Sequence, residues 1–169
     1  MSERPGGRES ERGPSGPAGG QERGATNERR DVAGKAAEAT RFEPPVSPVA
    51  APFWDATRER RLLLQWCAAC QSPVWYPREV CPGCLGSTLE WRESQGRGVV
   101  YACTVEHKAQ TRALEAPYVV ALVDLEEGVR LLSNVVGCPP ERVGVGDRVK
   151  VTWERLSDGR NLPLFAPVS

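Results

Sequence analysis

The chain has 169 residues, and its 22 lysine and arginine residues balance its 22 aspartate and glutamate residues, so the formal net charge is zero. A zero net charge argues against a large nonspecific surface for phosphates, because proteins with such a surface carry a basic excess. No apolar run approaches the ~20 residues of a membrane span, and the N-terminus lacks the ~7 to 15 apolar residues of a secretory signal. These patterns predict a soluble, cytoplasmic protein that does not bind to membranes.

Residues 1–46 differ in composition from the rest of the chain. They are rich in glycine, proline and charged residues, and Phe42 is their only aromatic residue. Such a segment buries too little apolar surface to offset the ~1 to 2 kcal/mol of backbone entropy that each residue loses on ordering. We therefore predict a disordered tail, which serves either as a solvated extension or as a docking arm for a partner.

Residues 47–64 are predicted to contain a short helix. The helical pattern covers residues 51–64, with Pro52 in the first turn, where its missing N–H costs little. Phe53 and Trp54 begin this helix, and Leu62 lies near its expected end.

Residues 65–86 carry the strongest chemical signal in the sequence. Two Cys-x-x-Cys pairs, Cys67 with Cys70 and Cys81 with Cys84, are separated by ten residues. Each pair directs two sulfurs at one point, and together they offer the tetrahedral set that structural Zn²⁺ binds at ~2.3 Å. The pattern predicts a zinc ribbon with a closed site, in which the metal supports the fold rather than activates water.

Other uses of these cysteines are less consistent with the sequence. Disulfides are disfavoured in a chain expected to be cytoplasmic, and redox Cys-x-x-Cys pairs seldom occur twice within so short a segment. Iron is chemically acceptable in the same four-thiolate site, so a rubredoxin-like electron carrier is an alternative hypothesis.

Residues 87–169 are predicted to form short strands. Apolar residues alternate over 99–105, 119–125 and 149–153, residues 129–136 are apolar on both faces, and a last short strand surrounds 162–165. Five such strands predict a small barrel of the OB type, with an open five-stranded sheet or a small sandwich as alternatives. The expected fold class is therefore mainly β, with one N-terminal helix and a metal ribbon before the barrel.

The sequence contains no familiar catalytic motif. It has no Walker phosphate loop, no Gly-x-Ser-x-Gly elbow and no His-Glu-x-x-His helix. His107, the only histidine, is interpreted as a surface residue, and Cys103 as an inert core thiol. We therefore assign no catalytic residue to this chain.

The order of these motifs resembles the rubredoxin-like zinc-ribbon plus OB-fold proteins associated with acyl-CoA enzymes. The resemblance covers residues 48–167, and Gln71 departs from it, because many members have glycine there. It rests on five motifs: Pro-Phe-Trp at 52–54, Pro-Arg-x-x-Cys-Pro-x-Cys at 77–84, Gly-x-Gly-x-Val-Tyr at 96–101, and apolar stretches at 117–123 and 131–138.

The resemblance implies a non-catalytic accessory subunit. Members of the family accompany thiolase-fold enzymes, including side-chain aldolases, or hot-dog-fold acyl-CoA hydratases of steroid and lipid degradation. Their helix and ribbon contact the partner, and a groove between helix, ribbon and barrel is expected to accept the CoA portion of a substrate. The candidate contact residues here are Phe53, Trp54, Leu62, Trp75, Tyr76 and Arg78.

Two of these residues have an alternative interpretation. Trp75 and Tyr76 lie in the loop between the cysteine pairs, where they form either an outward contact surface or a cover that packs the ribbon against the barrel.

A hypothesis of a different class is binding of single-stranded nucleic acid by the OB barrel. Trp91, Tyr101 and Tyr118 are candidate stacking platforms for bases. From residue 47 onward basic and acidic residues are equal in number and interspersed, which disfavours this function. The candidate phosphate ligands are Arg58, Arg60, Arg61, Arg97 and Arg112.

Overall fold

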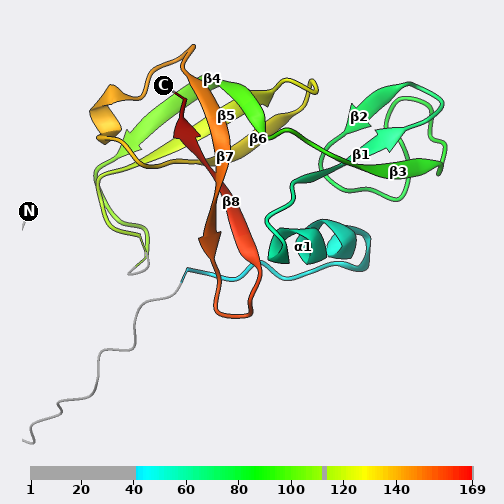
Figure 1. Cartoon of the computed structure of the whole chain (residues 1–169), viewed down its shortest axis with the longest axis horizontal. Coiled ribbons are helices and arrows are strands. Elements are labelled where there is room, and N and C mark those ends of the chain that lie inside the picture. The colour runs from blue at the N-terminus through cyan, green and yellow to red at the C-terminus, as the bar shows by residue number, and fades with distance from the viewer. Residues whose placement is uncertain (1–40, 112–113, 169) are drawn as a thin grey trace, which may run out of the picture. The chain divides into compact units, whose positions relative to one another are not determined.

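The computed structural model describes residues 41–111 and 114–168. Most of the predicted tail, residues 1–40, and the candidate phosphate ligand Arg112 lie outside the described residues. The described part contains one short α-helix, two 3-10 turns and eight β-strands, so it is mainly β as predicted (Figure 1). None of its helices is long and apolar enough to cross a membrane.

Five strands close into a barrel in the order β4-β5-β6-β8-β7 (Figure 1). This confirms the predicted five-stranded barrel and excludes the open sheet. All neighbouring pairs are antiparallel except β6 with β8, which run parallel. The strands are β4 (Arg97–Glu106), β5 (Tyr118–Leu125), β6 (Arg130–Val135), β7 (Arg148–Arg155) and β8 (Asn161–Pro167), with the turn η2 (Pro140–Arg142) before β7.

The ribbon is a separate three-stranded sheet in the order β2-β1-β3. It consists of β1 (Leu63–Cys67), β2 (Ser72–Val74) and β3 (Leu89–Glu93). β3 lies beyond residue 86, the expected end of the ribbon, and all five of its residues pair with β1. The ribbon sheet therefore continues to Glu93 before the chain enters the barrel.

The helix α1 (Ala51–Arg58) is shorter than predicted and follows the turn η1 (Pro48–Ala50). Arg60 adopts a left-handed conformation, with φ of 60°, which ends helical propagation. Leu62, expected near the end of the helix, instead precedes β1 and is 2% exposed. The reason is that an uninterrupted run of leucines has no period, so it suits a buried strand as well as a helix.

The barrel core contains the apolar face that alternation predicted for β5. Val119, Ala121, Val123 and Leu125 are all buried there. In β6, predicted to be buried on both faces, Leu132 is 60% exposed, so this strand is covered by protein on its inner face only.

β4 differs from its predicted pattern. Val100 is fully buried, whereas Val99 and Tyr101, which alternation had placed with the apolar face, are 39% and 51% exposed. A register shift between Val100 and Ala102 changes the phase of the strand. After this shift Cys103, expected in the core, pairs with the buried Ala121, and it is partly buried.

Gly98 explains how closely β4 approaches β5. A Cβ at this position would lie 2.4 Å from the carbonyl oxygen of Asp124. Gly96, which precedes β4, adopts a left-handed conformation with φ of +63°. Gly98 instead lies within β4, where the absence of a side chain permits the contact between the two strands.

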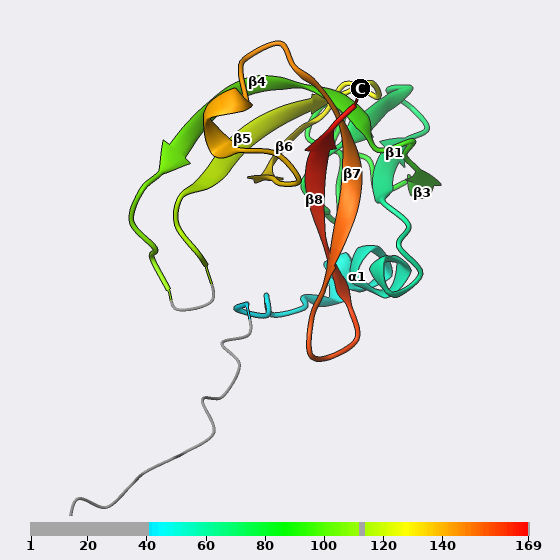
Figure 2. The same ribbon diagram turned by 60° about the vertical axis from the view of Figure 1, so that its left-hand side comes forward.

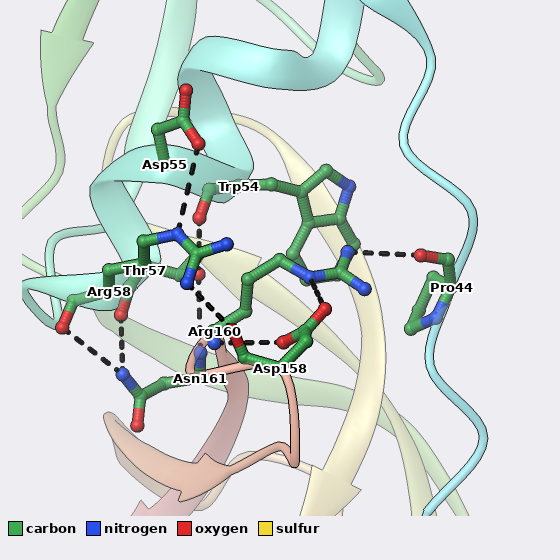
Figure 3. Close-up of polar contacts among 8 residues, drawn as sticks. All are labelled: Pro44, Trp54, Asp55, Thr57, Arg58, Asp158, Arg160 and Asn161. Carbon is green, nitrogen blue, oxygen red and sulfur yellow. Dashed lines mark hydrogen bonds and ion pairs between the residues drawn. The ribbon is translucent and has the colours of Figure 1, made fainter.

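Helix α1 packs beside the β7–β8 hairpin (Figure 2). Arg160 is 5% exposed, and its guanidinium donates a hydrogen bond to the side chain of Asp158 (Figure 3). Its guanidinium carbon lies 4.8 Å from the ring centroid of Trp54. Its guanidinium also donates to the carbonyl of Pro44 at 3.0 Å. Polar contacts thus hold the helix, the hairpin and the segment before the helix together.

Residues 41–46 were expected to belong to the disordered tail, and the structure differs. Arg41 donates to Glu154 at 2.7 Å and to the side-chain oxygen of Asn134 at 3.0 Å. Glu43 accepts hydrogen bonds from the hairpin residues Ser157 and Asp158. The composition argument missed this order because the contacts are polar and do not depend on an apolar cluster.

Candidate metal centre and apolar groove

The four predicted metal ligands converge at the end of the ribbon. One ligand atom from each of Cys67, Cys70, Cys81 and Cys84 lies within 4.8 Å of the others. The Cys67–Cys84 and Cys70–Cys81 sulfur distances are 3.6 and 3.7 Å. Tetrahedral coordination with bonds of ~2.3 Å places sulfurs about 3.8 Å apart. The cysteines therefore fit a four-sulfur structural metal site.

Main-chain groups support the negative charge of this site. The N–H of Cys70 donates to the sulfur of Cys67, and that of Gly83 to the sulfur of Cys81, both at 3.4 Å. Hydrogen bonds from the N–H groups of Cys84 and Gly83 lower the pKa of Cys81 to about 6. Such bonds favour a thiolate, the form in which cysteine binds a metal.

The close approach of the sulfurs raises the pKa of another ligand, Cys70. Hydrogen bonds to the neighbouring sulfurs, that of Cys84 first, raise the pKa of Cys70 to about 12. Four thiolates at this spacing repel one another, and a bound divalent cation relieves that repulsion. The donor set thus suits a cation and does not suit four free thiols.

The second functional feature is an apolar groove of about 630 Å³. Its walls come from η1, α1, the loop after β2, the β4–β5 connection, and strands β5, β6 and β8. No lining residue is charged, although charged residues make up 26% of the chain. The lining residues are Ser47, Ala50, Phe53, Trp54, Trp75, Tyr76, Pro77, Leu114, Tyr118, Val120, Leu131, Leu132, Ser133, Asn134, Leu162, Pro163 and Leu164.

Two of the predicted contact residues lie inside the chain's own core. Phe53 is 5% exposed and lines the groove, whereas Leu62 is 2% exposed and does not line it. The Phe53 ring packs edge-on against Trp54 at 5.0 Å and Trp75 at 5.4 Å. Phe53 therefore belongs to the aromatic wall of the groove and packs against its other two members, Trp54 and Trp75.

The other predicted contact residues lie at or near the groove. Trp54 and Trp75 are partly buried, and the indole nitrogen of Trp75 is buried without a hydrogen-bond partner among the described residues. Tyr76 is 54% exposed, and its ring lies 4.8 Å from that of Trp75. Arg78 is exposed. Its main-chain N–H donates to the side-chain oxygen of Gln65, and its carbonyl accepts from the side-chain amide of Gln65. Trp75 is thus partly buried at the groove, whereas Tyr76 beside it is mostly exposed.

Sequence reasoning missed the exposed apolar surface of the barrel. Ala102, Leu122 and Leu132 stand side by side on β4, β5 and β6. They line a shallow hollow that shares Val120 and Leu132 with the groove. Leu131 and Leu132 are adjacent apolar residues, so the sequence pattern did not indicate that Leu132 is the one that faces outward.

Four of the residues proposed for nucleic-acid binding have other partners or surroundings: Arg58, Arg61, Tyr101 and Tyr118. The guanidinium carbon of Arg130 lies 3.2 Å from the ring centroid of Tyr101, and Arg130 bonds both oxygens of Asp124 at 2.6 and 2.9 Å. Arg58 and Arg61 form ion pairs with nearby acids. Tyr118 lines the uncharged groove. These contacts do not form a basic surface with free stacking faces.

The fold and the cysteine site together define a metal-ribbon protein with an OB-type barrel. Two family models match in tandem: "ChsH2, rubredoxin-like zinc ribbon domain" over residues 54–90, and "ChsH2, C-terminal OB-fold domain" over residues 91–154. A DUF35 domain-containing scaffold protein of Methanocaldococcus jannaschii is 35% identical over 108 residues, which cover 62% of this chain and 77% of that protein. The chain belongs to this DUF35 family of ribbon and OB-fold proteins.

Other relatives match this chain over part of their longer sequences. A probable enoyl-CoA hydratase alpha subunit of Thermomonospora curvata is 40% identical over 116 residues, 68% of this chain and 36% of the relative. The 3-oxo-4,17-pregnadiene-20-carboxyl-CoA hydratase alpha subunit of Mycobacterium tuberculosis is 33% identical over 112 residues, 63% of this chain and 34% of the relative. The chain thus spans about a third of each of these two proteins.

A solved structure supports the same assignment. One chain of the "Ltp2-ChsH2(DUF35) aldolase" superposes with a TM-score of 0.69 and 38% identity, over 74% of this chain and 98% of that chain. These similarities confirm the family resemblance that the sequence motifs indicated.

Proposed function

We propose that this chain is a non-catalytic accessory subunit that binds and supports an acyl-CoA-processing enzyme, such as a thiolase-fold aldolase or a hot-dog-fold hydratase. The observation that carries the proposal is the continuous apolar surface formed by the groove and the outer face of β4–β6. Exposed apolar surface of this kind, with Tyr76 and Leu132 more than half exposed, is typical of a protein interface. The hydratase subunits and the aldolase complex among the relatives support an acyl-CoA enzyme as the partner.

We propose zinc as the metal, with a structural role. All four ligands come from the protein, so the site has no open position for a substrate. Cys67 ends β1, and Cys81 and Cys84 lie between β2 and β3, so a bound ion ties the strands of the ribbon together. Metal analysis of the purified protein tests this proposal. Bound zinc supports it, whereas iron with reversible one-electron chemistry would favour the electron-carrier hypothesis.

The groove does not match one expectation taken from the family. CoA carries several phosphate charges, and no side chain that lines the groove is charged. The groove is therefore better suited to an apolar group than to the CoA nucleotide.

Affinity purification of the tagged full chain from its native host tests the proposed function. We expect an acyl-CoA enzyme to be retained at a fixed stoichiometry, and its activity to fall when this chain is removed. Leu132→Glu should abolish retention, because it places a carboxylate on the apolar surface. Val145→Glu is the matched control, since Val145 is 70% exposed but lies outside the groove. Retention of no acyl-CoA enzyme by the wild-type chain would contradict the proposal.

A further inference from the structure

A hollow of about 480 Å³ lies where the loop after β6, the turn η2, the start of β7 and the end of β8 meet. It shares no lining residue with the apolar groove. Three of its eight lining residues are charged, namely Arg142, Asp147 and Arg148, whereas no residue that lines the groove is charged. We call this site the basic hollow, because its two arginines outnumber its one aspartate.

The arginines of the basic hollow have no acidic partner among the described residues. Neither Arg142 nor Arg148 forms an ion pair there, and both are exposed. The carboxylate of Asp147 binds the main chain instead, because its Oδ2 accepts the N–H of Gly144 at 2.8 Å. Glu141, next to Arg142, also forms no ion pair within the described part of the chain. Contacts among these residues therefore do not neutralise the positive charge of the hollow.

Two further basic residues extend this positive charge along the outer surface of β4 and β7. Arg97 and Lys150 are directly opposite each other in the antiparallel pair, so their side chains lie on the same face. Arg148 is two residues before Lys150 on β7 and shares that face. Among the described residues neither Arg97 nor Lys150 forms an ion pair, and nor does Glu126, whose N–H donates to the Arg97 carbonyl. Like charges directly opposite each other are destabilising, and a bound anion offsets this cost.

The chemistry of the basic hollow suits a phosphate group. A guanidinium presents a planar fork of N–H donors that matches the oxygens of a phosphate, and such charge-assisted hydrogen bonds are strong. No aromatic side chain lines the hollow. It therefore lacks the stacking platform that sites for single-stranded nucleic acid use, which favours a small phosphate-bearing molecule over a nucleic-acid strand.

We propose that the basic hollow binds a phosphate group of a small molecule, with the guanidinium groups of Arg142 and Arg148 as its ligands. Arg97 and Lys150 attract the anion from a longer distance, since they extend the same positive surface. The carboxylate of Asp147 repels the anion and so limits the affinity of the site. This inference goes beyond the proposed function, because it requires no partner enzyme.

Calorimetric titration of the full chain with sodium pyrophosphate at low ionic strength tests the site. We expect one molecule to bind per chain, and Arg142→Gln and Arg148→Gln each to weaken binding about tenfold or more, because each removes a charge-assisted contact. Wild-type melting temperatures in these variants would exclude unfolding as the cause of the loss.

Arg155→Gln is the matched control for these two variants. Arg155 is exposed at the other end of β7, forms no ion pair among the described residues and lies outside the hollow. Its replacement should change the affinity by less than about twofold, because exposed charges that are far apart are screened. Absence of pyrophosphate binding by the wild-type chain, or an equal loss in all three variants, would overturn the proposal.

Asp147→Asn tests whether the anion lies within the hollow. The asparagine keeps an oxygen that accepts the N–H of Gly144, but it removes the negative charge that repels the ligand. We expect pyrophosphate to bind about twofold or more tightly than to the wild-type chain. Glu79→Gln, at an exposed ribbon residue outside the hollow, is the control and should leave the affinity unchanged. Unchanged or weaker binding by Asp147→Asn would overturn the proposed site.

Coenzyme A and dephospho-coenzyme A distinguish the sources of the phosphate group. The two compounds differ only in the phosphate monoester on the ribose. Tighter binding of coenzyme A, lost in Arg148→Gln, would support the site and assign it to that monoester. Pyrophosphate binding as tight as that of either compound would support the site and assign it to a free anion.

A thymidine oligonucleotide tests the competing ligand class. Oligonucleotide binding that is tighter than that of pyrophosphate and both coenzymes would overturn the proposal in favour of nucleic-acid binding. All of these titrations use the chain without a partner, so their failure leaves the proposed accessory function intact.

Discussion

The side-chain amide of Asn161 donates to the main-chain carbonyl of Thr57 across 2.7 Å (Figure 3). Both residues are buried, with Thr57 fully enclosed and Asn161 5% exposed. The N–H of Asn161 also points to the Thr57 hydroxyl at 3.3 Å. This pair connects the last turn of α1 to the first residue of β8, and it thereby fixes the helical wall of the groove against the strand wall.

Asn161→Ala should lower the free energy of unfolding by ~1 to 3 kcal/mol, because the buried carbonyl of Thr57 loses its donor. Chemical denaturation monitored by tryptophan fluorescence measures this loss. Ser157→Ala is the control: Ser157 is exposed and bonds Glu43 at the surface, so its removal should cost less than about 0.5 kcal/mol. Equal stability of the Asn161→Ala and wild-type chains would show that the helix is held by other contacts.

Stability should fall in acid through Asp158. The N–H of Arg160, followed by its guanidinium, lowers the pKa of Asp158. A carboxyl whose folded pKa lies below its unfolded value of about 3.9 stabilises the fold above that pH and loses this contribution as the pH falls through the folded pKa. Asp158→Asn should therefore be less stable than wild type at about pH 6 and approach it at about pH 3. If the difference in stability between Asp158→Asn and wild type were the same at both pH values, the ion pair between Asp158 and Arg160 would not be the cause of the acid destabilisation.

Removal of one ribbon cysteine should release the metal and destabilise the ribbon. We expect Cys84→Ser to reduce the metal content, measured by plasma mass spectrometry, and to lower the melting temperature, because a four-thiolate site depends on all its ligands. Cys138→Ser is the matched control, since Cys138 lies outside the site and should leave both values unchanged. A chelator should reproduce the effect of Cys84→Ser in the wild-type chain. Melting that is insensitive to metal would contradict a structural role.

Tyr76→Ala should weaken partner binding without unfolding the chain. The ring is 54% exposed at the groove, and truncation of an aromatic interface residue costs about 2 kcal/mol, roughly 30-fold in Kd. Calorimetric titration with the partner measures this change. Leu85→Ala, at an exposed ribbon residue outside the groove, is the control and should bind normally.

Trp75→Ala should behave differently from Tyr76→Ala. Trp75 packs against the buried Phe53, so its removal should lower the melting temperature as well as the affinity. If both alanine variants bind the partner with wild-type affinity, the groove is not the interface.

Patterns within short stretches of sequence predicted the cysteine cluster and the barrel strands, because both depend on the spacing of residues along the chain. The cysteine pairs predicted that four sulfurs converge, and they do, because the spacing within each pair fixes its local geometry. Alternation located β4, β5 and β7 and assigned the buried face of β5 correctly, and apolar stretches located β6 and β8. These features are determined by residues that are close in sequence.

Features that depend on contacts between distant segments were not predictable in this way. The direction of Leu132 depends on which face of β6 meets the core, and each face carries at least one leucine. Whether the leucines at 62–64 continue the helix or form a strand depends on the left-handed conformation of Arg60 and on pairing with β3. The groove is formed by segments that range from Ser47 to Leu164 in the sequence, and no pattern within a short stretch predicts that these segments lie together.

The order of residues 41–46 has a consequence for deletion mapping. The family match begins at residue 54, which suggests a convenient place to shorten the chain. A chain cut there would leave Arg160 without the Pro44 carbonyl and Glu154 without Arg41. Such a truncation would disturb the hairpin that carries Asn161, so a resulting loss of partner binding would be misattributed to a missing docking sequence. Shortened versions should retain Arg41 and everything after it.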